Sequence, residues 1–469
     1  MKNYRYTVFT EKIESDIKRG VLKSGDKLPS VRLVKKEYGL STTSVQSGYD
    51  YLVYKGYVTS IPRSGYTVAE SRENNNLAEC VDLKSALPDP EFRENIVLTG
   101  TGRRLRGTTF LNSAVPSDSF IPQKLILKTM QQVVREKGAA LLRYYPSGGA
   151  YELRYLISQR LSTHGALIHP DELIITEGAL QSLFISLSVT TVPNDIVAVE
   201  SPCVFSVLEV ITNLGLRILE VPVKAGEGMD TDYLRKVCKK NNIKAIVLTP
   251  NFHNPTGILM TDEKKKEVCG IAVFHNIPII ENDVYGDLYF SNTRPSNIRN
   301  FDDSGLVITF SSFSKTLAPG IRLGWLAPGR FFPKAERLKF SLGRSVSPLN
   351  QELMIKLLET AAYDRHLRTF RAQLEQQSVQ FVEQFNTYFL GNICTHVPEG
   401  GYSIWNRLSE KTNMELFYRN CEKLGIRFTP GSTFSYKRSY GHYFRTVISQ
   451  KLIPSDLEAI KKLGQSLKT

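Results

Sequence analysis

The sequence predicts an α/β body with a mostly parallel central sheet, preceded by a small helical head that ends in a β-hairpin. From about residue 110 onward, short apolar runs alternate with amphipathic helices, which is the pattern of a parallel sheet covered by helices on both faces. Before it, three short helical stretches precede one alternating segment. We therefore predict a head over residues 1–70, a linker over 71–109 and a body over 110–469.

The composition excludes several classes of protein. Apolar residues make up 41% of the chain, which is ordinary for a globular protein, and no apolar run approaches the roughly 20 residues of a membrane span. The first residues lack the apolar stretch of a secretory signal. Six scattered cysteines, without a Cys-x-x-Cys pair or histidines at zinc spacing, predict free thiols in a reducing compartment and no metal site. These patterns favour a cytoplasmic protein that is not bound to a membrane.

Positive charge is concentrated at the start of the chain. The net charge is +14, and residues 1–70 hold 12 Lys or Arg against 7 Asp or Glu. A basic head is typical of nucleic-acid binding, although a solvated basic face would have the same composition.

The elements of the head follow from apolar spacing and capping residues. A four-residue apolar repeat predicts a helix over residues 7–19, and Ser30 and Ser41 stand as N-caps of two further helices that end at Tyr38 and Gly56. Residues 57–68 alternate around Arg63-Ser64-Gly65, which predicts a two-stranded hairpin. The positions expected to face the interior of the three helices are Phe9, Ile13, Ile17, Val21, Val45, Tyr49 and Leu52.

This arrangement is that of a winged helix–turn–helix. On the residues alone, a three-helix scaffold that does not bind nucleic acid remains equally open. Residues 25–32 (GDKLPSVR), 41–45 (STTSV) and 56–58 (GYV) resemble the GntR-type DNA-binding domain. The resemblance implies contacts with double-stranded DNA from Arg32, Thr43, Ser44 and Arg63, with Arg63 at the tip of the wing. Thr42 stands where the family commonly has an arginine.

The linker is polar at its start and carries three arginines between Gly102 and Gly107. No strand precedes these glycines and their spacing does not match a dinucleotide fingerprint. We interpret the arginines as solvated, with contact to DNA phosphates as the alternative.

In the body, the expected strands at residues 173–176, 196–200, 243–249, 277–281 and 305–310 end in polar motifs. Ligands of parallel sheets bind beyond the carboxyl ends of the strands. After the first of these strands, Gly178 lets the backbone approach a ligand, and the free amides of Ala179 and Leu180 at a helix start predict a seat for a phosphate. Any strand-to-helix turn looks similar, so this signal is weak alone.

Residues 311–325 (SSFSKTLAPGIRLGW) follow the last of these strands. A lysine there can form an imine with an aldehyde, while hydroxyls and a nearby arginine can hold a phosphate; a surface lysine is the alternative. The segment closely resembles the pyridoxal-phosphate lysine segment of fold type I aminotransferases. That resemblance makes Lys315 the catalytic Schiff-base lysine, which holds pyridoxal 5'-phosphate as an internal aldimine. Ser312 and Arg322 would bind the phosphate of the cofactor.

The same resemblance implies further site residues. Asn254, in a motif (NPTG) that is otherwise a tight turn, and Tyr285 would bind the phenolic oxygen of the cofactor. Arg445, a lone arginine in an apolar strand, would bind the carboxylate of an amino compound; a buried salt bridge is the alternative. Tyr144 would reach the cofactor phosphate of a neighbouring subunit, which implies a homodimer.

Two positions depart from the aminotransferase pattern. The carboxylate that pairs with the pyridine nitrogen is replaced by Asn282, and Asp283 next to it faces the other side of the strand. We therefore expect weaker protonation of the ring nitrogen and a poorer electron sink. Val204 takes the place of a stacking aromatic, so either Phe205 stacks on the ring or that face is aliphatic.

Head and body in this order resemble the MocR/GabR-type transcriptional regulators over nearly the whole chain. The resemblance implies a DNA-binding regulator whose aminotransferase-like body binds pyridoxal phosphate and senses that cofactor or an amino compound. The alternative is an active amino-acid transaminase with a DNA-binding appendage.

Overall fold

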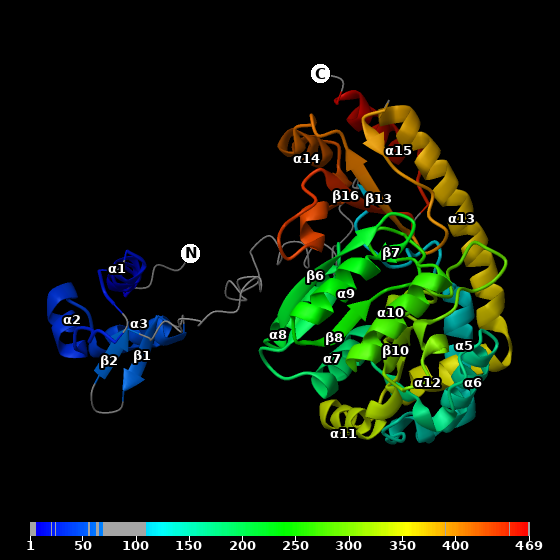
Figure 1. The fold of residues 1–469 in the computed structure, drawn as a ribbon, viewed down its shortest axis with the longest axis horizontal. Helices are drawn as coiled ribbons and strands as arrows, with labels where there is room; N and C mark the ends of the chain where they lie inside the picture. The colour runs from blue at the N-terminus through cyan, green and yellow to red at the C-terminus, as the bar shows by residue number, and fades with distance from the viewer. Residues whose placement is uncertain are drawn as a thin grey trace. The chain divides into compact units, whose positions relative to one another are not determined.

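The computed structural model describes residues 6–19, 21–23, 25–54, 57–61, 65–68, 109–389, 391–449 and 451–467. The chain divides into two compact units, Met1–Cys80 and Val81–Thr469 (Figure 1). The first contains the head and the second contains the body, and each has its own hydrophobic core.

The head has the predicted winged helix–turn–helix fold. Helices α1 (Thr7–Lys18), α2 (Val31–Tyr38) and α3 (Thr42–Tyr54) are followed by strands β1 (Val58–Ile61) and β2 (Gly65–Val68). The two strands pair antiparallel, with Val58 opposite Val68. The core of the head consists of Phe9, Ile13, Leu28, Val34, Val45, Tyr49, Leu52, Val58 and Val68.

The two predicted caps of the head are present. The Ser30 hydroxyl accepts a hydrogen bond from the Leu33 amide at 3.3 Å, and the Ser41 hydroxyl accepts one from the Ser44 amide at 3.1 Å. The expectation for Val21 is wrong: it lies beyond the end of α1 and is 67% exposed, so it faces solvent. Gly56, the predicted end of α3, and the wing tip at residues 62–64 lie outside the described residues.

A mostly parallel sheet forms the centre of the body, as predicted. Its strand order is β4-β11-β10-β9-β8-β5-β6-β7. The five strands from β10 to β6 are mutually parallel, whereas β11 runs antiparallel to β10 and β4, and β7 runs antiparallel to β6. The strands are β4 (Ile174–Thr176), β5 (Ile196–Ser201), β6 (Arg217–Lys224), β7 (Gly228–Met229), β8 (Ile243–Leu248), β9 (Ile279–Asn282), β10 (Val307–Ser312) and β11 (Gly324–Ala327).

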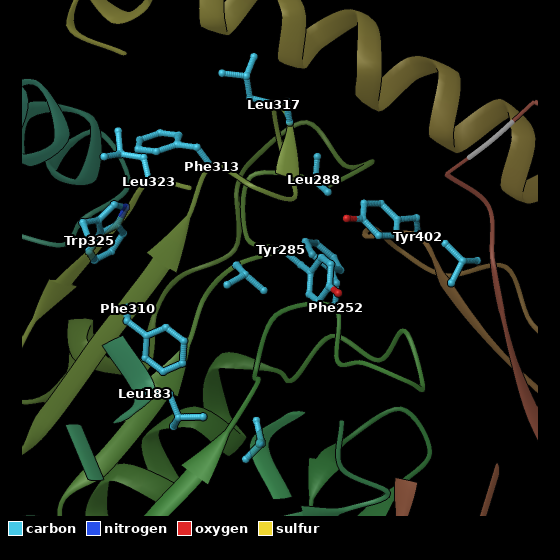
Figure 2. Packing of buried hydrophobic residues seen from close by; sticks show 14 of the residues in the cluster. Leu183, Phe252, Tyr285, Leu288, Phe310, Phe313, Leu317, Leu323, Trp325 and Tyr402 are labelled. Atoms are coloured by element: carbon cyan, nitrogen blue, oxygen red, sulfur yellow. The ribbon is translucent and has the colours of Figure 1, made fainter. Parts of the chain in front are cut away.

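Helices cover this sheet. They are α5 (Gln123–Lys137), α6 (Tyr151–Ser162), α7 (Ala179–Thr190), α8 (Phe205–Asn213), α9 (Thr231–Lys240), α10 (Asp262–His275), α11 (Phe332–Leu342) and α12 (Pro348–Glu359). Helix α7 contacts β9, β10 and β11, and Figure 2 shows Leu183 of this helix near Phe310 of β10. The apolar faces of helix and sheet thus meet in a core beneath the strand ends.

The chain from α13 onward builds a smaller subdomain. Helix α13 (Ala362–Phe389) runs along the body from α12 to α15 (Pro454–Gln465) (Figure 1). A second sheet has the order β12-β13-β16-β15, with β12 (Ile393–Cys394), β13 (Ser403–Leu408), β15 (Thr429–Pro430) and β16 (Tyr443–Val447), and α14 (Met414–Lys423) follows β13.

The start of the body is joined to this subdomain. Strand β3 (Thr109–Phe110) pairs parallel with β14 (Ile426–Arg427), so Thr109, which the predicted bounds assign to the linker, already belongs to a sheet. Among the described helices, none is long and apolar enough to cross a membrane.

Candidate cofactor and effector site

One cavity of about 260 Å³ lies at the carboxyl ends of the parallel strands. Its walls come from the segments that follow β4, β5, β8, β9 and β10, together with residues 113–115 and one residue of β16. The structure brings to this cavity ten residues of the predicted site: Ala179, Leu180, Phe205, Asn254, Asn282, Tyr285, Ser312, Lys315, Arg322 and Arg445. Asp283 and Tyr144 are not among the residues that line it.

Lys315 follows the end of β10 and is half-buried in the cavity wall. Its Nζ donates a hydrogen bond to the Ala114 carbonyl at 2.7 Å. Burial, and then the positive charges of Arg445 and Arg322, lower the pKa of this amine from 10.5 to about 8. A larger neutral fraction makes the amine a better nucleophile near pH 7.

Another part of the cavity wall, around Arg322, is suited to receive an anion. Arg322 has a left-handed backbone (φ +47°), and its Nη2 donates to the Glu177 carbonyl at 2.6 Å. Gly178 (φ +103°) lies against this guanidinium, since a Cβ there would be 3.1 Å from Arg322 Nη2. Helix α7 starts at the next residue without a side-chain cap, so its first amides are open to a ligand. The Ser312 hydroxyl, which donates to the Leu323 carbonyl at 3.1 Å, lies in the same wall.

Two polar side chains meet in the middle of the cavity. Asn254 Nδ2 donates to the Tyr285 hydroxyl oxygen at 3.2 Å. The ring of Tyr402 stands perpendicular to that of Tyr285, with 5.4 Å between the ring centroids (Figure 2). Burial raises the pKa of Tyr285, so this phenol stays protonated and can donate a hydrogen bond. Both Val204 and Phe205 line the neighbouring wall.

The adjacent residues Asn282 and Asp283 face different environments, as the alternation of a strand end requires. Asn282 lines the cavity, and its Oδ1 accepts a hydrogen bond from the Val284 amide at 3.3 Å. Asp283 is 1% exposed, forms an ion pair with Arg294, and accepts from Asn251 Nδ2 at 3.0 Å. The carboxylate of Asp283 is therefore turned to these partners outside the cavity, and Asn282 is the residue of this pair that lines it.

Arg445, in β16, is 1% exposed. Its guanidinium donates to Asn254 Oδ1 at 2.9 Å, to Thr429 Oγ1 at 3.0 Å and to the Asn112 carbonyl at 2.5 Å. No carboxylate is among its partners within the described residues, so the alternative of a buried salt bridge is not formed. Its Nε is buried without a hydrogen-bond partner, and burial lowers its pKa to about 10. A buried cation whose partners are neutral oxygens and the ring of Phe434, 5.0 Å away, is suited to receive an anion.

Residues 112–115, which we call the strap, cross this site and were not predicted. Arg445 holds the carbonyl of Asn112, while Lys315 and the hydroxyl of Tyr402 (3.3 Å) hold the carbonyl of Ala114. The partners are 333 and 201 positions apart in the sequence, and no local pattern signals such contacts.

Tyr144 lies outside the cavity of its own chain. Its side chain is 73% exposed, and the Arg344 guanidinium lies 4.8 Å from its ring centroid. Other large apolar side chains nearby in the sequence are exposed too, including Leu142 (89%) and, on α6, Tyr151 and Tyr155.

The predicted DNA contacts are partly described. Arg32 on α2 and Thr43 on α3 are exposed, whereas Ser44 is half-buried and its hydroxyl lies 2.9 Å from that of Ser41. Thr42 Oγ1 accepts a hydrogen bond from Lys35 Nζ at 3.4 Å. Arg63 lies outside the described residues.

The fold and the cavity together define a DNA-binding protein with an aminotransferase-like body. Residues 6–68 match the family of bacterial regulatory proteins called the gntR family, and residues 112–451 match the aminotransferase class I and II family. The chain belongs to the class I and II aminotransferase family through its body and carries a gntR-type head, and it is a transcriptional regulator with the architecture of the MocR type.

Similar proteins share this organisation. The HTH-type transcriptional regulator YjiR of Escherichia coli (strain K12) is 30% identical over 469 residues, which cover 100% of this chain and 99% of the relative. The HTH-type transcriptional regulator NorG of Staphylococcus aureus (strain USA300) is 28% identical over 88% of this chain and 93% of its own. The crystal structure of a multiple substrate aminotransferase from Thermococcus profundus matches with a TM-score of 0.74 at 24% identity, and covers 82% of this chain and 96% of the enzyme. The similarity to this enzyme shows a shared fold.

Proposed function

We propose that the body of this transcriptional regulator binds pyridoxal 5'-phosphate at Lys315 and senses a small amino compound, and that occupancy of the cavity is transmitted to the DNA-binding head. The observation that carries this proposal is the pair of hydrogen bonds from Lys315 and Arg445 to the strap. Lys315, which would engage the cofactor, donates to the Ala114 carbonyl at 2.7 Å, and Arg445, which would engage the ligand, donates to the Asn112 carbonyl at 2.5 Å.

The residues around the cavity fit the cofactor. Arg322, the Ser312 hydroxyl and the open amides of α7 would hold its phosphate, and Tyr285 and Asn254 would donate to its phenolic oxygen. When bound, pyridoxal phosphate supplies an aldehyde that condenses with amines and a ring that withdraws electrons. Lys315, with a pKa of about 8, would attack that aldehyde as the neutral amine.

Asn282 favours sensing over efficient transamination. Its amide is anchored through oxygen by the Val284 amide, so it offers a neutral donor where a carboxylate would stabilise a positive ring nitrogen. Without that negative charge the ring withdraws electrons less strongly. A working transaminase remains the second candidate because Lys315, once released by an incoming amine, lies in the cavity with a pKa suited to carry a proton.

The strap offers a physical route for the signal. A carboxylate bound at Arg445 competes with the Asn112 carbonyl for the guanidinium N–H groups, and a covalently engaged Lys315 no longer donates to Ala114 in the same way. A ligand shifts a conformational equilibrium only if its contacts differ between the two conformations. The hydrogen bonds from Arg445 and Lys315 to the strap would differ between the empty and the occupied cavity. The strap follows β3, the first strand of the body along the chain.

We propose that the regulator acts as a homodimer in the cytoplasm, where its DNA partner is. The exposed apolar side chains at Leu142, Tyr144, Tyr151 and Tyr155 support the dimer, because a subunit interface would cover them. In this arrangement Tyr144 would donate to the cofactor phosphate of the other subunit.

The test begins with the full-length protein mixed with pyridoxal phosphate. We expect a visible absorption band, and borohydride reduction should fix a pyridoxyl group on the peptide that contains Lys315, as measured by mass spectrometry. Lys315→Ala should lose both signals with an unchanged circular dichroism spectrum, whereas Lys334→Ala, at an exposed lysine, should keep them. A colourless wild-type protein that remains unlabelled would refute the cofactor assignment.

Sensing and enzymatic turnover are then separated with the loaded protein. An amino-acid panel with a keto acid should change the absorption band without accumulation of the keto product, and a footprint on the DNA upstream of the gene should change when ligand is added. Many product molecules per protein would establish the transaminase instead.

A further inference from the structure

We propose that the effector is an α-amino acid whose side chain carries no charge, and that the cavity discriminates against basic and acidic amino acids. This inference rests on the proposed function, since it concerns the ligand of the same site. It is carried by the charges and by the apolar surface of the cavity wall.

All charged side chains that line the cavity are cationic: Lys315, Arg322 and Arg445. Each already has a partner in the proposed complex, namely the aldehyde of the cofactor, its phosphate and the α-carboxylate of the effector. No Asp or Glu is among the lining residues. A cationic side chain of an effector would therefore find no carboxylate in the wall to pair with, and an anionic side chain would find no cation that is still unpaired.

Two buried acidic residues close to the cavity wall in sequence, Asp283 and Glu200, are engaged elsewhere. Asp283 forms an ion pair with Arg294 outside the cavity. Glu200 is buried, lies 3.3 Å from His253 Nε2 and accepts a hydrogen bond from the Thr249 amide at 2.7 Å. Turning either carboxylate toward an effector would leave its present partners buried without it, which is costly.

The remaining wall is suited to an uncharged group. It includes the strap, with Ser113, Ala114 and Val115, and the segment at the start of α8, with Val204, Phe205, Ser206 and Val207. These residues offer methyl groups, an aromatic ring and two hydroxyls. An apolar or neutral side chain is desolvated here at little cost, whereas an ammonium group or a second carboxylate loses its hydration without an opposite charge in return.

Matched pairs of ligands test the inference on the full-length protein loaded with pyridoxal phosphate. Norleucine and lysine differ by a terminal ammonium group, and glutamine and glutamate differ by one charge. The readout is the dissociation constant from the change of the visible band, checked by calorimetry. We expect lysine to bind at least roughly tenfold more weakly than norleucine, and glutamate more weakly than glutamine.

A change in the wall should weaken the discrimination against lysine. Ser113→Asp places a carboxylate in the wall and should narrow the gap between lysine and norleucine, whereas Ser113→Asn, with the same shape and no charge, should leave the gap unchanged. Lysine that binds as tightly as norleucine to the wild type, or glutamate as tightly as glutamine, overturns this inference alone. No response to any of the four amino acids overturns the proposed function together with it.

Discussion

The pKa of the Lys315 amine gives a direct test of the electrostatics of the cavity. At pH 7 a pKa of about 8 leaves about one amine in ten neutral, against about one in three thousand at the ordinary value of 10.5. Covalent capture of pyridoxal phosphate needs the neutral amine. Its rate should therefore rise with pH and level off above a midpoint near pH 8 in the wild type.

Arg445→Met removes one of the two positive charges that lower this pKa. The loss of a like charge stabilises the protonated amine, so the midpoint should move upward by about one pH unit and capture at pH 7 should slow roughly tenfold. Burial, the larger cause, persists, so the midpoint should stay below 10.5. The assay is stopped-flow absorbance between pH 6 and 10, with Arg407→Met, at an exposed arginine, as the unchanged control. A wild-type midpoint near 10.5, or a lower midpoint in the variant, would refute the reasoning.

Three further outcomes are expected. Arg63→Ala should weaken DNA binding and reduce its salt dependence by about one counterion, measured by fluorescence anisotropy at several salt concentrations; an unchanged slope removes the wing from the interface. Arg294→Met should destabilise the body by about 3–5 kcal/mol in urea unfolding, because it leaves Asp283 (0% side-chain exposure) buried without its ion-pair partner; a loss within error would contradict this burial cost. Ser30→Ala removes the N-cap of α2 and should cost about 1 kcal/mol. Hydrogen exchange at the Leu33 amide should then be roughly fivefold faster, and equal exchange would exclude the cap.

Much of this architecture follows from local patterns. Ser30 caps its helix as predicted because an N-cap bond depends only on residues three apart. Asn254, Tyr285 and Lys315 could be predicted to lie together because each follows a buried parallel strand, and such strands end at one edge.

The contacts that complete the site could not be predicted in this way. Electrostatics left a buried salt bridge open as the alternative for Arg445, yet the guanidinium donates to neutral oxygens, including the Asn112 carbonyl. Arg294, the ion-pair partner of Asp283, lies in a loop whose sequence has no periodic pattern. Such pairs depend on the tertiary structure, whereas a sequence pattern indicates only which groups need a partner.

The strap also has a consequence for protein synthesis. Asn112 leaves the ribosome long before Arg445, and β3 must await β14, so the body can complete its fold only when translation is nearly finished. The head, with a hydrophobic core of its own, is free to fold much earlier, as N-terminal domains generally do. A nonsense mutation upstream of β16 therefore yields a fragment that retains the head while lacking Arg445, the residue that the proposed function makes the receptor of the effector carboxylate. In a cell that also carries an intact copy of the gene, such a fragment would occupy the same DNA without responding to the proposed effector.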